Sequence, residues 1–328
     1  MITTTKLHSY SELKELFEQH LFAKGFEDLP QPLYEPTLHI MKMKAKRIRP
    51  VLLLAACEAF GGTLSNALDA AAAIEVYHNF TLVHDDIIDE ADLRRNEATV
   101  HKSFGIKKAI LTGDVMSLHA MKVLNKVPRK KHYDLLNIFL EISSRVIEGE
   151  MLDVEFEKKE EISVQEYIHM IRLKTSVFLA GALQMGALLG DADASDQKSI
   201  YAFGENLGIA FQIKDDYLDV FGDQKTFGKR IGGDIVQNKK TFLICRLTEK
   251  ADAAAKRKLN QIFQERDEEK KMWEMKKMLS EFNIQKDTYR MMRHYYTKAI
   301  DSLEALSLDP ERVALISLFA KKIYERNY

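Results

Sequence analysis

The chain has 328 residues, of which 46% are apolar and 30% are charged, and its formal net charge at pH 7 is −1. This composition is ordinary for a folded globular protein, and the balanced charge argues against a nucleic-acid partner or an anionic membrane surface. The most apolar stretch, Ser176 to Gly190, carries Gln184 and three glycines and falls short of the roughly 20 residues that a membrane span needs. No integral membrane segment is therefore expected.

Apolar residues recur at the i, i+3, i+4 spacing of amphipathic helices through most of the chain, and no segment shows the alternation of β-strands. This spacing predicts helices over residues 9–23, 34–45, 48–60, 65–89, 106–126, 130–150, 164–189, 194–221 and 240–247, and three or four more beyond residue 251. No break between them resembles a flexible linker. We expect an all-α helical bundle with one domain over residues 1–328, to which the helices of residues 250–328 also belong.

The remaining general features point to the cell interior. Cys57 and Cys245 lie in apolar surroundings without metal-ligand spacing, which predicts buried free thiols in a reducing compartment. The N-terminus lacks a signal-peptide pattern, so a cytoplasmic protein is expected. Residues 249–298 are rich in Lys, Glu, Arg and Met and contain the single tryptophan, Trp273. Solvated amphipathic helices explain this composition, and a partner-binding surface is the alternative.

Two aspartate clusters are the most informative feature. Each has the form D-D-x-x-D at the end of an apolar helical stretch, and together they contain Asp85, Asp86, Asp89, Asp215, Asp216 and Asp219. Positions i and i+4 share a helix face, so carboxylates crowd each helix end and repel one another unless a countercharge is present. Mg²⁺ prefers a few carboxylates together with water and substrate phosphates. The clusters therefore suggest a diphosphate bridged by metal ions.

Basic and polar residues accompany both clusters. His78 lies two turns before Asp85 on the same face, and Arg94 and Arg95 follow the first cluster. Arginine suits bidentate phosphate contacts, although a surface salt-bridge network is the simpler alternative. Gln212 shares a face with the second cluster.

Further lysines and arginines stand at places that suit anions. A loop from Phe227 to Thr241, rich in glycine and lysine, follows the second cluster and contains Lys229 and Lys239. Lys46 and Arg49 open a helix, where backbone N–H groups favour anions. Lys174 and Thr175 interrupt an otherwise apolar helix. Taken alone, such basic positions are usually solvated surface, and only their association with the two clusters gives them weight.

Together these residues resemble the trans (head-to-tail) isoprenyl diphosphate synthases, from the Lys46–Pro50 segment to at least Thr241. The two D-D-x-x-D motifs, the Arg-Arg pair and the F-Q-x-x-D-D-x-x-D form of the second motif carry the resemblance. It implies an all-α bundle around a deep central cavity, usually a homodimer. It also implies transfer of an allylic chain to isopentenyl diphosphate.

The resemblance further implies a role for each site residue. The six aspartates would bind three Mg²⁺ ions that hold the allylic diphosphate. Contacts to that diphosphate would come from Arg94, Lys174, Lys229 and Lys239. The metal-free site for isopentenyl diphosphate would contain Lys46, Arg49, His78 and Arg95. Thr175 and Gln212 would place oxygens near the carbocation.

The chain departs from the family pattern at three places. Lys44-Ala45 replaces Gly-Gly before the first basic motif, Asn96-Glu97-Ala98 replaces Gly-x-Pro after Arg-Arg, and Asn238 replaces the frequent glycine before Lys239. These changes affect backbone geometry rather than charged ligands.

Product length in this family depends on the residues four and five places before the first motif, here Thr81 and Phe80. Phe80 lies about 7.5 Å back along the helix axis, where it would form a floor for the growing chain. One aromatic residue without an insertion in the motif resembles geranylgeranyl diphosphate synthases. Farnesyl or longer products are the alternatives, and Phe80 as a plain core residue is the simpler interpretation.

Two other classes compete with this prediction. A terpene cyclase shares the first motif and the fold, but its second metal site usually mixes Asn, Ser or Thr with Glu. A regulatory subunit of a heteromeric synthase typically loses an aspartate motif, and neither is lost here.

Overall fold

The computed structural model describes residues 7–23, 26, 29–222 and 232–324, and their regular structure is helical apart from one short hairpin. The prediction of an all-α protein is confirmed. The chain forms two compact units. Unit 1 comprises Met1–Leu140, Gly181–Ile200 and Leu306–Phe319, and unit 2 comprises Glu141–Ala180, Tyr201–Ala305 and Ala320–Tyr328. The expectation of a single domain over residues 1–328 remains a prediction.

Unit 1 contains the N-terminal helices and the hairpin. Its complete elements are α1 (Tyr10–Ala23), α2 (Gln31–Lys42), α3 (Ile48–Ala59), α4 (Leu64–Ile88), β1 (Leu93–Arg94), β2 (Glu97–Ala98), α5 (Val100–Phe104) and α6 (Ile106–Leu124). It also contains parts of α7 (Arg129–Glu157), α9 (Val177–Leu189), α10 (Ala194–Phe221) and α17 (Pro310–Tyr324).

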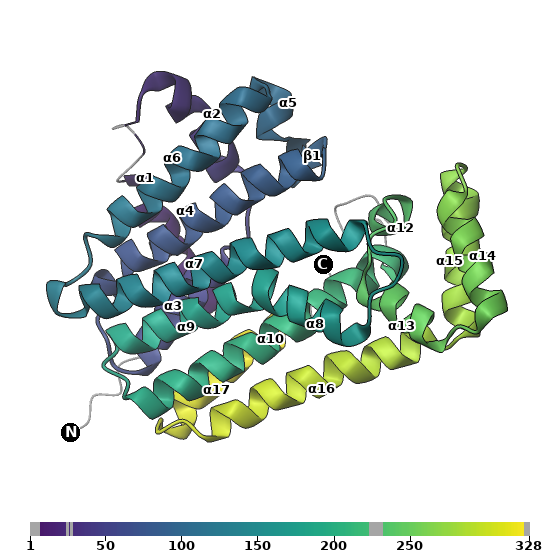
Figure 1. The fold of residues 1–328 in the computed structure, drawn as a ribbon. Helices are drawn as coiled ribbons and strands as arrows, with labels where there is room; N and C mark the ends of the chain where they lie inside the picture. Colours follow the sequence, from purple (N-terminus) through teal and green to yellow (C-terminus); the bar gives the residue numbers. More distant parts are fainter. Residues whose placement is uncertain (1–6, 24–25, 27–28, 223–231, 325–328) are drawn as a thin grey trace. The chain divides into compact units, whose positions relative to one another are not determined.

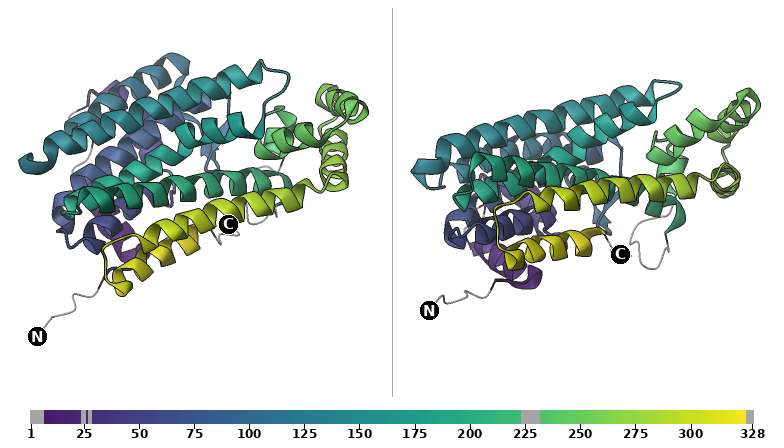
Figure 2. Two further views of the ribbon diagram at one scale, coloured as in Figure 1. Left: turned by 60° about the horizontal axis from the view of Figure 1, so that its bottom comes forward. Right: turned by 90° about the horizontal axis from the view of Figure 1, so that it is seen from below.

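The core of unit 1 forms around α4. This helix buries small and apolar residues on nearly every side, including the run from Ala70 to Ile74. It packs against α6, α3, α1 and α2, and α4 and α6 run side by side (Figures 1 and 2). A helix held on so many sides presents its last turn, with the first aspartate motif, in a fixed position.

Unit 2 contains the remaining elements. They are α8 (Val164–Ile171), the π-helical turn η1 (Arg172–Ser176), α12 (Gly233–Val236), α13 (Phe242–Lys250), α14 (Ala253–Gln264), α15 (Glu268–Glu281) and α16 (Ile284–Glu304), with the remaining parts of α7, α9, α10 and α17.

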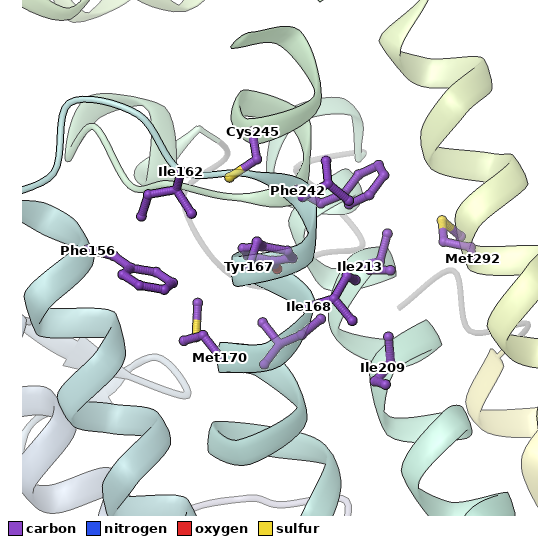
Figure 3. Packing of buried hydrophobic residues seen from close by; sticks show 12 residues of the cluster. Phe156, Ile162, Tyr167, Ile168, Met170, Ile209, Ile213, Phe242, Cys245 and Met292 are labelled. Atoms are coloured by element: carbon purple, nitrogen blue, oxygen red, sulfur yellow. The ribbon is translucent and has the colours of Figure 1, made fainter. Parts of the chain in front are cut away.

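Two apolar clusters hold unit 2 together. The first joins α8, α10, α13 and α16, and Figure 3 shows Tyr167 near its middle, with Phe156 on one side and Phe242 on the other. The second joins the end of α10 to α12, α13, α14 and α15 through residues that include Ile235, Leu243 and Met275. The second aspartate motif on α10 therefore has one apolar cluster at each end.

The helices predicted from apolar spacing are present, and most bounds agree within a few residues. The predicted helix 164–189 is divided, because a π-helical turn separates α8 from α9. The hairpin of β1 and β2 was not predicted, because it is too short to show alternation. The helices α5 and α12 also escaped prediction, because five and four residues are too few for a helical period.

Both cysteines are buried free thiols, as predicted. Burial raises the pKa of Cys57 to about 12 and raises that of Cys245 as well, so neither thiol is activated. Among the described residues, no helix combines the length and the apolar character needed to cross a membrane.

Candidate functional site

The first aspartate motif closes α4 and contacts the hairpin that follows it. Asp86 is almost fully buried, and Arg94 on β1 donates from Nε and Nη2 to Asp86 Oδ1 at 2.9 and 2.5 Å. The same Nη2 donates to Asp85 Oδ2 at 3.2 Å. The backbone N–H of Asp89 caps the helix on the carbonyl of Asp85. The structure therefore brings Arg94 onto the carboxylates of Asp85 and Asp86, which is the salt-bridge arrangement that the sequence analysis kept as the alternative to a phosphate contact.

The hairpin turn explains one departure from the family pattern. Arg95 and Asn96 link the two strands with φ values of 55° and 67°, the left-handed region that two-residue hairpin turns require. Asparagine tolerates this region better than most residues, so Asn96 can replace a glycine there. Lys44 and Ala45 need no such tolerance, because neither is among the described residues with positive φ.

One carboxylate oxygen of Asp86 could coordinate a metal ion. Burial raises the pKa of this carboxyl, and the hydrogen bond and charge of Arg94 oppose that rise. Its second oxygen, Oδ2, is buried and makes no hydrogen bond in the part of the chain that the structure describes. A buried carboxylate oxygen without a donor is suited to a hard cation. Within the same residues, no three His, Cys, Asp or Glu side chains converge closely enough to hold a cation by themselves.

A cluster of basic side chains lies beside α4, one to two turns before the aspartates. Arg49 Nη1 donates to His78 Nε2 at 3.1 Å, and Arg95 Nη1 donates to Asn79 Oδ1 at 3.5 Å. Burial holds the pKa of His78 well below its ordinary value, and the charges of Arg49 and Arg95 add to this effect. His78 is therefore neutral and carries its proton on Nδ1, because Nε2 accepts from the guanidinium. Three of the predicted residues are thus gathered in one place.

Arg47 supports this basic cluster, and the sequence analysis gave it no role. It is buried in the left-handed conformation before α3 and donates to Glu75 Oε1 and to the carbonyl of Met41, each at 2.6 Å. The buried pair fixes the start of α3 and so the place of Arg49. Lys46, by contrast, is exposed, and its carbonyl accepts from the Tyr10 hydroxyl at 2.6 Å.

Phe80 belongs to a column of aromatic rings. Its ring meets Tyr77 edge-on at a centroid distance of 4.9 Å and His84 at 5.0 Å, and Tyr77 meets Phe139 at 5.3 Å. Gly113 on α6 leaves room for His84, since a Cβ there would lie 2.2 Å from His84 Nε2. Thr81 donates to the carbonyl of His78 at 2.8 Å. Sequence reasoning identified Phe80 but not the rings around it.

Hydrogen bonds from three elements surround Asp216 in the second motif. The Tyr167 hydroxyl and the Phe242 N–H both donate to Asp216 Oδ2, the latter at 3.0 Å. Gln212 Nε2 donates to Oδ1 at 3.2 Å. Burial and, after it, the charge of Asp234 raise the pKa of Asp216 to about 8, against these hydrogen bonds. Its position is therefore set by α8, α10 and the start of α13, and Tyr167 was absent from the predicted set.

The π-helical turn presents Lys174 and Thr175. Thr175 Oγ1 donates to Gln212 Oε1 at 3.1 Å, so these two predicted residues are in contact. Lys174 Nζ donates to Asp153 Oδ2 at 2.6 Å and to Glu150 Oε1 at 3.1 Å. Gly149 lets α7 approach this turn, because a Cβ there would lie 2.2 Å from the backbone nitrogen of Lys174. Functional sites often contain such turns.

The two carboxylates that hold Lys174 were not predicted. Glu150 and Asp153 are half-buried on one face of α7, three residues apart. The only sequence signal was an acidic pair at helical spacing after a glycine, which is common on solvated helices.

The remaining predicted residues lie at the end of α10 and beyond it. Asp219 Oδ2 accepts from the Asp234 N–H at 3.2 Å, and its carbonyl accepts from the Gly232 N–H at 2.7 Å. Lys239 lies directly after α12. Lys229 falls outside the described residues. Each unit thus gathers its own set of predicted residues.

Comparison with known proteins agrees with this geometry. Residues 30–281 match the model of the family described as polyprenyl synthetase. The chain belongs to the polyprenyl synthetase family. It is 35% identical over 285 residues to the geranylgeranyl diphosphate synthase of Sulfolobus acidocaldarius, covering 85% of this chain and 86% of that protein.

Further members of the polyprenyl synthetase family match nearly the whole chain. A short chain isoprenyl diphosphate synthase of Methanothermobacter thermautotrophicus is 32% identical over 324 residues, or 98% of each chain. A crystal structure of a geranylgeranyl pyrophosphate synthase superposes with a TM-score of 0.93 at 39% identity, covering 97% of this chain and 99% of that one. The family predicted from the two aspartate motifs is confirmed.

Proposed function

We propose that this protein is a trans-prenyltransferase that condenses isopentenyl diphosphate head-to-tail with an allylic diphosphate, and that its product is geranylgeranyl diphosphate. One observation carries the proposal. Arg49, His78 and Arg95 form a partly buried basic cluster one to two turns away from the first aspartate motif, which we propose as a second anion site. A condensation of two diphosphates needs such a second site, whereas cyclisation of one diphosphate does not. The names of the relatives support the product.

We assign the six aspartates Asp85, Asp86, Asp89, Asp215, Asp216 and Asp219 to three Mg²⁺ ions. The donor set fits, because carboxylates are the ligands that Mg²⁺ prefers, and the bare Oδ2 of Asp86 offers a position. Water and diphosphate oxygens would complete each coordination sphere. When bound, the ions act as Lewis acids and neutralise the charge of the diphosphate.

The cationic side chains complete this neutralisation. Arg94, Lys174, Lys229 and Lys239 are proposed to donate to the oxygens of the allylic diphosphate. The carboxylates that now hold Arg94 and Lys174 fix both cations before substrate arrives. Pre-oriented charges stabilise the departing diphosphate more strongly than mobile ones, because no reorganisation is needed during reaction.

Isopentenyl diphosphate is proposed to bind the basic cluster, which would comprise Lys46, Arg49, His78 and Arg95. The arginines donate to its phosphate oxygens, and neutral His78 offers its Nδ1 proton. Holding the double bond next to the allylic carbon makes the condensation effectively intramolecular.

The oxygens of Thr175 and Gln212 are proposed to face the allylic cation. The contact between the two side chains fixes both, and both side chains are neutral, so neither repels the cation. The departing diphosphate can accept the proton lost after condensation, so no side chain need act as a strong base. Apolar walls must exclude water, which would otherwise trap the cation.

Chain growth is proposed to stop at Phe80, with Thr81 beside it. The ring is half-buried and braced by Tyr77 and His84, which gives a rigid floor rather than a mobile side chain. A fixed floor explains why one product would predominate.

The proposed assembly is a homodimer in the cytoplasm, and α6 offers a face for self-association. Its exposed apolar side chains are Ile106, Ile110, Leu111 and Leu118, with exposed fractions of 57%, 42%, 57% and 62%. Leu111 and Leu118 are seven residues apart, so they share one side of the helix. Exposed apolar side chains that share one side of a helix are typical of a protein interface.

Replacing Leu111 and Leu118 together with glutamate is expected to convert a dimer to a monomer, because both charges would be buried at the interface. Size-exclusion chromatography with light scattering measures the mass directly. Trp273→Glu is the matched control, because Trp273 is 63% exposed on a different helix. A double variant that elutes as a dimer would show that α6 is not the interface.

The test of function is direct. Purified protein is incubated with Mg²⁺, isopentenyl diphosphate and one allylic starter at a time (dimethylallyl, geranyl or farnesyl diphosphate), and products are sized by mass spectrometry. A dominant twenty-carbon diphosphate is expected. A product of another chain length would support the proposed condensation but refute geranylgeranyl diphosphate as its product. No elongation, despite joint thermal stabilisation by Mg²⁺ and a bisphosphonate, would indicate a cyclase or a regulatory subunit.

A further inference from the structure

A buried lysine outside the proposed catalytic set joins two helix ends in unit 2. Lys271 on α15 is 4% exposed, and its Nζ donates to the carbonyl of Val236 at 3.1 Å and to that of Phe263 at 3.2 Å. Val236 ends α12 and Phe263 lies in the last turn of α14. Two carbonyl oxygens therefore stabilise this ammonium group. Burial lowers the pKa of Lys271, so a charge at this place needs these partners.

The segment held by Lys271 leads directly into Lys239. Asn238 follows α12 with φ 57°, its N–H donates to the carbonyl of Ile235 at 3.1 Å, and the N–H of Lys239 donates to that of Asp234 at 2.9 Å. This pair of bonds is the Schellman arrangement that ends many helices with a left-handed residue. The direction in which Lys239 leaves the helix is consequently set by the position of α12.

The other end of α12 is attached to the second aspartate motif. The N–H of Asp234 donates to Asp219 Oδ2, and the N–H of Gly232 donates to the Asp219 carbonyl. Met272, next to Lys271 on α15, packs against Gly232, where a Cβ would lie 2.6 Å from its sulfur. Helix α12 thus lies between Asp219 and α15, and α15 contacts both of its ends.

Asn238 and Lys271 share one acceptor. Asn238 Nδ2 donates to the carbonyl of Phe263 at 3.3 Å, and Lys271 Nζ donates to the same oxygen. Asn238, which replaces the family's frequent glycine, therefore keeps the left-handed backbone and adds a hydrogen bond to α14. Both side chains hold the peptide that carries Lys239.

We propose that Lys271, assisted by Asn238, is a positioning residue that aims Lys239 at the allylic diphosphate, so that the hairpin of α14 and α15 forms part of the diphosphate site. This inference rests on the proposed function. Lys271 touches no substrate. It acts by keeping α12 and Lys239 at a fixed distance from Asp219, and a displacement of about 1 Å at a charged ligand is enough to weaken binding and catalysis substantially.

Lys271→Met tests the proposal, because methionine retains the length and packing of the side chain and removes only the ammonium group. The KM for the allylic diphosphate is expected to rise about tenfold. The KM for isopentenyl diphosphate should change by less than about twofold, because the residues of its proposed site all belong to unit 1. Lys270→Met is the matched control, since Lys270 is an exposed neighbour paired with Glu265.

A second variant and a binding measurement separate positioning from loss of stability. Asn238→Gly keeps the left-handed backbone and removes only the amide tie, so it should raise the same KM by a smaller factor. In the double variant the two increases should not multiply, because both act through the Phe263 carbonyl. Calorimetry with Mg²⁺ and an unreactive bisphosphonate should show weaker binding in the same order, without any need for turnover.

The outcomes are distinct. If the wild-type protein neither elongates nor binds the bisphosphonate, the proposed function fails. If wild type is active and Lys271→Met, folded at the assay temperature, leaves both KM values unchanged or raises both together, the positioning role is refuted. Should Lys271→Met not fold, Asn238→Gly alone decides, and an unchanged KM for the allylic diphosphate would overturn the proposal.

Discussion

Replacing Asp85 with asparagine is expected to lower kcat by at least about a hundredfold, while the protein keeps its fold. Asparagine preserves the shape of the side chain but removes one of the charges that would bind Mg²⁺. The hydrogen bonds from Arg94 go mainly to Asp86, so the contact between α4 and the hairpin should persist. Turnover is measured over a range of Mg²⁺ concentrations, because a lost ligand should also raise the metal requirement.

The control for this variant lies in the short connection that follows α4. Asp92 is exposed and pairs with Lys102 at 2.7 Å, away from the motif residues, so Asp92→Asn should keep wild-type turnover. The matching change in the second motif, Asp215→Asn, should resemble Asp85→Asn. If either motif variant retained kcat within about threefold of wild type, the assignment of that motif to metal binding would be wrong.

Replacing Phe80 with alanine is expected to lengthen the product by one or two five-carbon units. Removal of the ring opens space below the end of the growing chain, but Tyr77, one turn further from the motif, remains as the next ring of the column. Growth should therefore stop again after a short extension and should not continue to long polymers. Mass spectrometry of the products from farnesyl diphosphate measures the shift.

Leu82→Ala provides the comparison for this change. Leu82 is two residues further along α4, about 200° round the helix, so its truncation should leave product length unaltered. An unchanged product distribution in Phe80→Ala, with normal turnover, would place the floor elsewhere and return Phe80 to the role of a core residue.

Much of the fold was predictable because helical periodicity is local. The predicted helix 194–221 matches α10, and the start of α3 was predicted at Ile48. The side chains that set this period lie within four residues of one another, so no distant contact is needed to find it. The π-helical turn inside the predicted helix 164–189 was invisible, because its extra residue depends on packing against α7 and on Gly149.

The candidate site was predictable to the extent that its chemistry lies in contiguous motifs. Asp85, Arg94, Asp216 and Gln212 were identified from spacing along one helix or one turn. Partners of the predicted residues were missed when they came from another element, as with Tyr167 on Asp216 and Asp153 on Lys174. Lys271, which holds the end of α12 ahead of Lys239, was missed for the same reason.

The sequence by itself determined the family, the helical class and the two aspartate motifs, since each depends on residues close together in the chain. Only the tertiary structure decided which groups surround those motifs. It placed Tyr167 on Asp216 across 49 positions and Lys271 on Val236 across 35. Such pairings are fixed by packing of apolar faces, and many different side chains would satisfy the same pattern of apolar and polar positions.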